Sequence, residues 1–302
     1  MNNKYNIIID TDPGIDDCIA LCAVDYYSGK RFKAAVSTYG NMPQFRTTNN
    51  LLTMLQYLNR PDVYAIKGSK ENEGRYDSAS YIHGVDGMGG AGKDFPEFDT
   101  MPSNFADEVY YKIKEFAPVD YIALGPLTNI AEIIKQHPDV CDFIHAFYVM
   151  GGGFDMGNVT PFAEFNIYTD PASANYFFAN ATAPIYLAPL NTTSTIYYDF
   201  AEIDEYKASG RFDDFCSHIL TEEIKSSKIY GEPGAIMHDA TATIIMTNPE
   251  LFEYKNCGVR VICDEGERFG ETIMTEGNNV YVALKADSRK VLELITKALS
   301  KK

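Results

Sequence analysis

Short apolar runs alternate with amphipathic segments along most of the chain. The runs have the length of buried strands, and in the segments between them apolar residues recur every three to four positions, as on one face of a helix. The sequence predicts strands at residues 6–9, 34–38, 63–66, 120–124, 147–150, 185–187, 259–263 and 280–285. It predicts helices from residue 15, around 49–58, and at 105–116, 127–136 and 289–299. This alternation indicates an α/β fold with an open, mainly parallel sheet, helices on both faces and a Rossmann-like core.

Two segments depart from this rhythm. Residues 68–102 are rich in Gly, Asp and Ser, and a loop of this length predicts a functional loop or a lid. Residues 197–248 have helical patterns interrupted at 231–234, which predicts a helical C-terminal region. Neither repeats nor a linker divide the sequence, so we expect one domain over residues 1–302.

Composition limits the partners. The 302 residues include 26 Lys+Arg and 42 Asp+Glu, a net charge of −16, which argues against nucleic-acid binding and is compatible with cation binding. No apolar run approaches the roughly 18 residues of a membrane span, and the first residues contain no signal-peptide core. The six cysteines form no Cys-x-x-Cys pair, which is typical of reduced thiols. We therefore expect a cytoplasmic protein.

Four acidic residues lie within eight positions after the first predicted strand: Asp10, Asp12, Asp16 and Asp17. Helix capping by Asp12 before Pro13 would explain one or two of them. Four carboxylates repel one another unless a cation neutralises them, and oxygen ligands favour Ca²⁺ or Mg²⁺. The glycine at position 14 fits neither an EF-hand nor an aspartyl-phosphatase motif. The residues alone thus favour a metal site over a simple cap.

Other polar residues follow later strands, and ligands of open α/β sheets bind at the carboxyl ends of the strands. These residues are Asn41, Asn158, Glu164 and Asn166. Two histidines have a suggestive context: His83 lies in the long loop, and His238 precedes Asp239 at a predicted helix start. Taken alone, Asp239 would be a helix cap and His238 its chance neighbour.

Together these segments resemble the Ca²⁺-dependent nucleoside hydrolases of the inosine–uridine preferring type. The resemblance covers most of the chain in consistent order. It is carried by Ile-Asp-Thr-Asp-Pro-Gly-Ile-Asp-Asp at 9–17, Gly-Asn at 40–41, Ile-His-Gly at 82–84, Ala-Leu-Gly-Pro-Leu-Thr-Asn at 123–129, Met-Gly-Gly-Gly at 150–153, Gly-Asn at 157–158, Ala-Glu-Phe-Asn at 163–166, Asp-Pro at 170–171 and His-Asp at 238–239.

The resemblance implies a site and a reaction, the hydrolysis of the N-glycosidic bond of ribonucleosides in salvage or catabolism. Ca²⁺ would be held by Asp12, Asp17, Asp239 and the carbonyl of Leu124. Asp12 would act as general base, His238 would protonate the leaving base, and His83 would be a secondary contact on the base side. The ribose contacts would be Asp16, Asn41, Asn158, Glu164 and Asn166. The resemblance also implies a homodimer or homotetramer.

The chain contains no Trp. Purine-specific members of the family stack the base between indole rings, so the resemblance points to the nonspecific or pyrimidine-preferring branch, with Tyr230 or Phe154 as candidate stacking residues. Two alternatives remain open: hydrolysis of a related N-riboside such as nicotinamide riboside, and non-catalytic binding of a nucleoside or Ca²⁺.

Overall fold

An eight-stranded sheet forms the centre of the protein in the computed structural model, which describes residues 4–70, 78–94 and 104–300. Its strands follow the order β3-β2-β1-β4-β5-β6-β10-β9. Their bounds are β1 Asn6–Thr11, β2 Phe32–Ser37, β3 Tyr64–Lys67, β4 Val119–Ala123, β5 Ile144–Met150, β6 Ile185–Ala188, β9 Phe252–Val261 and β10 Thr272–Ala286. Neighbouring strands are parallel except β9 and β10, which pair antiparallel. The predicted open, mainly parallel sheet is confirmed.

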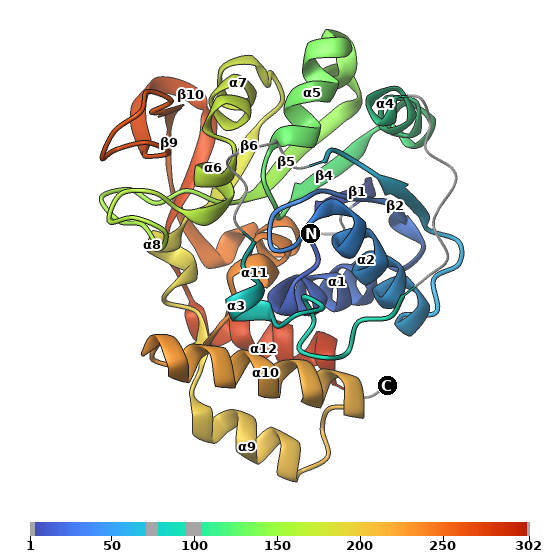
Figure 1. The fold of residues 1–302 in the computed structure, drawn as a ribbon. Helices are drawn as coiled ribbons and strands as arrows, with labels where there is room; N and C mark the ends of the chain where they lie inside the picture. The colour runs from blue at the N-terminus through green and yellow to red at the C-terminus, as the bar shows by residue number, and fades with distance from the viewer. Residues whose placement is uncertain (1–3, 71–77, 95–103, 301–302) are drawn as a thin grey trace.

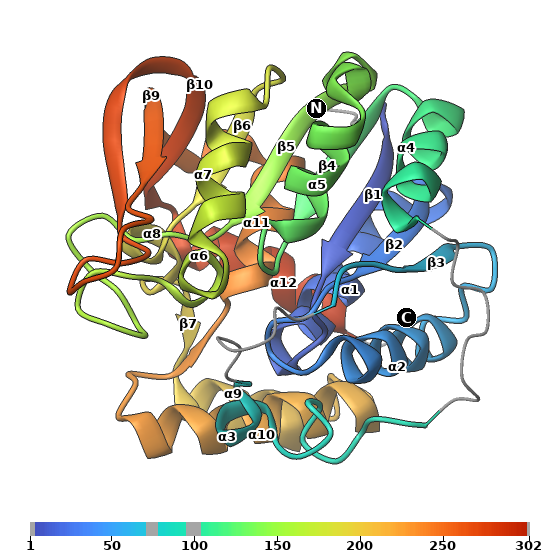
Figure 2. The same cartoon turned by 45° about the horizontal axis from the view of Figure 1, so that its top comes forward.

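Helices cover both faces of this sheet (Figure 1). Their bounds are α1 Ile15–Ser28, α2 Gln44–Tyr57, α3 Ser80–His83, α4 Phe105–Phe116, α5 Thr128–Gln136, α6 Phe165–Thr169, α7 Pro171–Asn180, α8 Leu190–Thr193, α9 Phe200–Ala208, α10 Asp214–Tyr230, α11 His238–Thr247 and α12 Ser288–Leu299. The short 3₁₀ turns are Gly29–Arg31, Pro138–Phe143 and Pro249–Leu251. α4, α5 and α7 lie on one face, whereas α1, α11 and α12 lie on the other, with α9 and α10 beyond them (Figures 1 and 2). None of the helices in the described ranges is long and apolar enough to span a membrane.

The central strand β1 shows why the sequence folds in this way. Its three isoleucines are fully buried, and alternate residues of a strand point to opposite faces. Ile7 and Ile9 belong to the core beneath α1, α11 and α12, whereas Ile8 belongs to the core beneath α4, α5 and α7. A strand that is apolar on both faces must lie between two helical layers.

The C-terminal part differs from the prediction in detail. Between residues 197 and 248 the helices α9, α10 and α11 are accompanied by two short paired strands, β7 Tyr197–Tyr198 and β8 Ala235–Ile236. The strand β9 begins at Phe252 and ends at Val261, whereas 259–263 was predicted, and β10 begins at Thr272, well before the predicted 280–285. Exposed polar residues within each strand, such as Lys255 and Glu276, hide the strand pattern. The helices α6, α7 and α8 were not predicted. The break after α10 is confirmed: Gly231 has the left-handed conformation that commonly ends a helix.

A buried hydrogen-bond network fixes the carboxyl ends of the central strands. Asp10 accepts hydrogen bonds from the Tyr121 hydroxyl at 3.0 Å and from Nδ2 of Asn129 at 2.8 Å. Asn129 Oδ1 in turn accepts the backbone N–H of Ser69 at 2.7 Å, so β1, β4 and the loop after β3 are joined. Burial raises the pKa of the Asp10 carboxyl to about 7, although both hydrogen bonds lower it. Asp10 therefore fixes the strand ends on which the site is built, and it does not line the cavity.

We expect Asp10→Asn to change how stability depends on pH. The folded chain keeps the Asp10 proton up to about pH 7, whereas an unfolded chain releases it near its usual pKa of 3.8. The wild-type protein therefore loses stability relative to the variant as pH rises between these values. Urea unfolding at about pH 5 and about pH 8 should show the variant gaining at least about 1 kcal/mol over wild type. A pH-independent difference would contradict this role of Asp10.

Candidate active site

A cavity of about 650 Å³ opens at the carboxyl ends of the parallel strands. The strand order places it where β1 has β2 on one side and β4 on the other, so the chain leaves the two sides in opposite directions. Such a switch point is where ligands bind in open α/β sheets. Nine predicted site residues line the cavity: Asp16, Asn41, His83, Leu124, Asn158, Glu164, Asn166, His238 and Asp239. The predicted Asp12 and Asp17 are not among the lining residues.

Asp12 lies just after β1 and is buried in a space that only glycines allow. A Cβ atom on Gly40 or on Gly125 would overlap the Asp12 carboxylate. One oxygen, Oδ2, accepts the backbone N–H of Asn41 at 2.7 Å, whereas Oδ1 is buried without a hydrogen-bond partner. Burial and the nearby charge of Asp17 hold the pKa of Asp12 well above its usual value. The free oxygen is thus available to a metal ion, a water molecule or a proton.

Three further carboxylates meet beside Asp12. Oxygen atoms of Asp16, Asp17 and Asp239 lie within 4.8 Å of one another. Burial raises the pKa of each of these three groups, and the charges of neighbouring acids raise those of Asp17 and Asp239 further. The sequence placed Asp16 next to the metal and Asp12 among its ligands, whereas the carboxylates that could hold an ion together in the described residues are Asp16, Asp17 and Asp239, without Asp12. Such a group favours a cation.

Helix capping does not explain these acids. The helix α1 begins at Ile15 with Gly14 as its N-cap, so Asp12 lies outside the capping position. The helix α11 begins at His238 with Met237 as its N-cap, which places Asp239 inside the first turn. Neither Asp12 nor Asp239 therefore has the simple capping role that the residues alone allowed. Asp17 does accept the backbone N–H of Gly14 at 2.9 Å and thereby closes the first turn.

The amide and carboxylate residues opposite this cluster are held by backbone contacts. Glu164 accepts the N–H groups of Gly152, Asn166 and Ile167 at 2.8, 2.9 and 3.1 Å, and burial raises its pKa. Asn166 Nδ2 donates to the Leu124 carbonyl at 2.6 Å, and both residues line the cavity. These partners orient the side chains before any ligand arrives.

Asn41 and Asn158 are oriented in the same manner. Asn41 Nδ2 donates to Oδ2 of Asp17 at 3.0 Å and to the Asp12 carbonyl at 3.2 Å, which joins the end of β2 to the first acidic turn. Asn158 Oδ1 accepts the N–H of Phe165 at 2.9 Å and leaves its amide nitrogen for other partners. The structure thus brings both predicted amides to the cavity wall.

His83 ends the short helix α3 and reaches the start of α1. Its Nδ1 accepts the backbone N–H of Ile15 at 3.1 Å. Because a backbone N–H can only donate, the imidazole carries no proton on Nδ1 and is neutral with its proton on Nε2. This agrees with its burial, which lowers the pKa of His83 to about 4. A Cβ on Gly14 would collide with this ring, so glycine is required where the histidine approaches.

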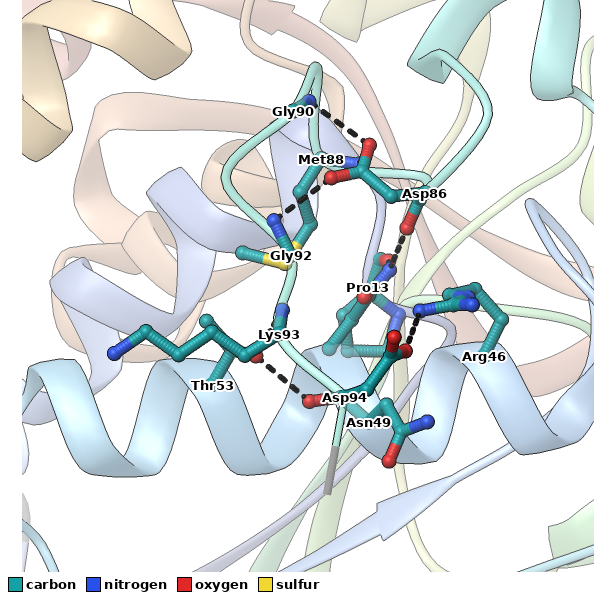
Figure 3. A network of polar contacts seen from close by, with 11 residues as sticks. Pro13, Arg46, Asn49, Thr53, Asp86, Met88, Gly90, Gly92, Lys93 and Asp94 are labelled. Atoms are coloured by element: carbon teal, nitrogen blue, oxygen red, sulfur yellow. Dashed lines mark hydrogen bonds and ion pairs between the residues drawn. The ribbon is translucent and has the colours of Figure 1, made fainter.

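The segment after His83 is held against α2 and the first acidic turn (Figure 3). The Asp86 carboxylate accepts the N–H groups of Met88, Gly90 and Gly92 at 3.1, 2.9 and 2.8 Å. Asn50 Nδ2 donates at 2.9 Å both to the Asp86 carbonyl and to the Pro13 carbonyl. The described part of the long loop is therefore tied to the site by specific contacts. The rest, 71–77 and 95–102, lies outside the described residues, and a lid function stays a prediction.

His238 begins α11 and lies at the cavity wall. Its Nδ1 is 2.8 Å from the hydroxyl of Thr193, which is fully buried at the end of α8. When the hydroxyl donates, the imidazole proton is on Nε2, the nitrogen that Thr193 leaves free for the cavity. Burial lowers the pKa of His238 to about 4, which favours the neutral ring.

The cavity also contains residues that the sequence did not single out. Glu223, Ser226 and Ser227 line it from α10, and Thr193 supports it from α8. Spacing of three to four residues along α10 was the available signal, but it cannot show which neighbour a helix face meets. Of the two candidate aromatic residues, Tyr230 lines the cavity, whereas Phe154 is not among the lining residues and packs against the core.

Comparisons with known proteins identify the family of this chain. The family model of inosine-uridine preferring nucleoside hydrolases matches residues 7–293, and the chain belongs to this family. It is 31% identical to pyrimidine-specific ribonucleoside hydrolase RihA of Salmonella gallinarum, over 97% of each chain. It is also 31% identical to uridine nucleosidase 1 of Arabidopsis thaliana, over 92% of this chain and 84% of that protein.

Solved structures show the same relationship. A plant nucleoside hydrolase, the PpNRh1 enzyme, superposes with a TM-score of 0.88 at 28% identity and 99% coverage of both chains. A purine-preferring ribonucleoside hydrolase from Gardnerella vaginalis gives a TM-score of 0.87 at 25% identity and 98% coverage of both. The chain is thus an enzyme that hydrolyses ribonucleosides.

Proposed function

We propose that this enzyme uses a Ca²⁺ ion held by Asp12, Asp17, Asp239 and the carbonyl of Leu124. The observation that carries the proposal is the unpartnered Oδ1 of Asp12 beside the Asp16, Asp17 and Asp239 carboxylates. No Lys or Arg of the described residues lines the cavity, and buried oxygens in such surroundings fit a hard divalent ion. When bound, Ca²⁺ supplies positive charge that offsets the carboxylates and makes a neighbouring water molecule more acidic.

Asp12 has the position of a general base in this proposal. Its Oδ2 is fixed by the Asn41 N–H, so the remaining lone pairs of Oδ1 are free to accept a proton from the attacking water. The raised pKa that burial gives Asp12 would make its carboxylate a stronger proton acceptor than an exposed aspartate. Asp16, Asn41, Asn158, Glu164 and Asn166 would hold the ribose next to this oxygen.

The same residues would stabilise the sugar as the bond breaks. Cleavage of a glycosidic bond builds positive charge on the ribose ring. Buried Glu164, with its two oxygens fixed by three backbone N–H groups, and Asp16 would place negative charge around that ring without reorganising. The amide oxygens of Asn158 and Asn166 would contribute further partial negative charge.

His238 would assist departure of the base, and His83 would contact it from the α3 side. With the Thr193 hydroxyl as donor to Nδ1, His238 would carry its proton on Nε2, which could donate toward a ring nitrogen or oxygen of the base. Because burial lowers the pKa of His238, the donor at neutral pH is the neutral imidazole. Its Nε2–H would stabilise the departing base by a hydrogen bond as negative charge develops there.

Thr193 should act as a positioning residue for this histidine. We expect Thr193→Val to lower kcat about tenfold with little change in KM, because the isosteric valine leaves Nδ1 without its partner. Thr193→Ser, which keeps the hydroxyl, should retain most of the activity. Steady-state kinetics of both variants test this, and a wild-type kcat for Thr193→Val would contradict it.

We further propose pyrimidine ribonucleosides as preferred substrates. The absence of Trp and the presence of His238 support this preference, and two relatives at 31% identity are named for pyrimidine-specific or uridine hydrolysis. A panel of uridine, cytidine, inosine and adenosine, with ribose release measured for each, tests it. The proposal expects kcat/KM for uridine or cytidine to exceed that for the purine nucleosides, and a purine preference would contradict it.

We also propose a compartment and a metabolic role for the enzyme. A role in nucleoside salvage or catabolism in the cytoplasm agrees with six cysteines that are all unpaired, five of them buried. We propose a homodimer or homotetramer as the working assembly, and light scattering of the purified protein measures it.

A further inference from the structure

Glu223 is an acidic residue of the cavity that the proposed chemistry does not use. It lies on α10, across the cavity from the sheet edge, where Ser226, Ser227 and Tyr230 share its helix face. Its side chain is only partly accessible, and the hydroxyl of Ser227 one turn later is its hydrogen-bond partner. The Glu223 carboxylate is therefore part of the cavity wall formed by α10, whereas the aspartates of the proposed metal site lie at the sheet edge.

The charge of Glu223 has no positive partner in the cavity. No lysine or arginine among the described residues lines it. Burial, with the charge of Asp16 as a smaller contribution, raises the pKa of Glu223 to about 8. The neighbouring Glu222 differs, since it forms an ion pair with Lys225 at 2.6 Å outside the cavity. A partly buried acid without a cationic partner in its cavity is a candidate for contact with a polar ligand group.

The surroundings of Glu223 suit a flat heterocycle. Ile82 and Ile236 provide apolar wall, and the rings of Tyr81 and Tyr230 meet edge to face with centroids 5.9 Å apart. If the ribose lies against the sheet-edge carboxylates, the base must extend toward this apolar wall. Two acids lie on this side of the cavity, Glu223 and Glu232, and Glu232 is exposed whereas Glu223 is partly buried. The Glu223 carboxyl can accept hydrogen bonds from N–H groups of the base.

We infer that Glu223 is a specificity-determining residue that accepts a hydrogen bond from the ring N–H of the nucleobase, such as N3–H of uracil. This inference rests on the proposed function, because it assumes that the base occupies the α10 side of the cavity. The hydrogen bond to Glu223 would favour bases that have a ring N–H next to a carbonyl over analogues in which this proton is replaced.

Uridine and 3-methyluridine, in which the N3 proton is replaced by a methyl group, test the contact. For Glu223→Ala, kcat/KM for uridine should fall about tenfold to a hundredfold, and the preference for uridine over 3-methyluridine should collapse. Glu223→Gln, which keeps an acceptor oxygen, should retain part of the preference. Glu222→Gln is the matched control on the same helix and should behave as wild type.

A merely structural role of Glu223 would lower kcat/KM for both nucleosides equally, and an unchanged ratio would overturn the inference. Calorimetric dissociation constants of both nucleosides, measured in an Asp12→Asn background with and without Glu223→Ala, read the contact independently of turnover. If wild type binds both nucleosides but releases no ribose, the proposed function fails. The inference fails separately if Glu223→Ala leaves the ratio of the two dissociation constants unchanged.

Discussion

Asp12→Asn should abolish turnover and leave the protein folded. The amide preserves the acceptor for the Asn41 N–H but removes the carboxylate that is proposed to take the proton from water. Loss of a general base and of one metal ligand should reduce kcat by at least about a thousandfold. Ribose release under saturating Ca²⁺ and uridine measures this directly.

The stability of Asp12→Asn without metal is a second test of the role of this residue. Because burial raises the pKa of Asp12, its ionised form is disfavoured in the folded protein, and a neutral amide should make the metal-free protein at least as stable as wild type. Asp94→Asn is the control: this exposed aspartate pairs with Arg46 at 2.6 Å, away from the proposed chemistry. Wild-type turnover in Asp12→Asn would refute its assignment as the base.

Removal of the proposed Ca²⁺ ion should have the second large effect. Chelation should eliminate activity and lower the melting temperature, and added Ca²⁺ should restore both, with about one ion bound per chain. The carboxylates of Asp12, Asp16, Asp17 and Asp239 repel one another when no cation separates them. Elemental analysis and thermal unfolding before and after chelation measure these outcomes.

The size of the Ca²⁺ effect should depend on pH with a defined sign. In the metal-free protein these acids have raised pKa values, so the folded state holds protons that the unfolded state releases. Stability of the metal-free protein therefore falls as pH rises above the usual value near 3.8, and the stabilisation by Ca²⁺ should grow over the same range. Full activity in metal-free protein, or a Ca²⁺ shift that is independent of pH, would contradict the site.

The sequence predicted the layers of the fold because β1 is apolar on both faces, which no exposed strand could be. It predicted the acidic turn through Asp12 and Asp17, since close carboxylates need a compensating cation. The roles of Gly40 and Gly125 became clear only in three dimensions, where each leaves the space that the Asp12 carboxylate fills. Spacing along the chain does not show such contacts between distant loops.

The sequence did not predict Thr193, which contacts His238, or Glu223, which lines the cavity. Thr193 lies in a polar run without a distinctive pattern, and its contact with His238 spans 45 positions. Glu223 has the charge pattern of an ordinary exposed helix, and only the packing of α10 over the cavity shows that it faces inward. Long-range packing, which local patterns do not encode, decides both positions.

The most direct test of the account is a single turnover of uridine by an excess of the protein with Ca²⁺ present. Mass spectrometry should show free uracil and ribose formed in equal amounts by the wild-type protein, and intact uridine with Asp12→Asn under the same conditions. Intact uridine with the wild-type protein, or products formed equally fast by Asp12→Asn, would contradict the claim that the Asp12 site performs the hydrolysis.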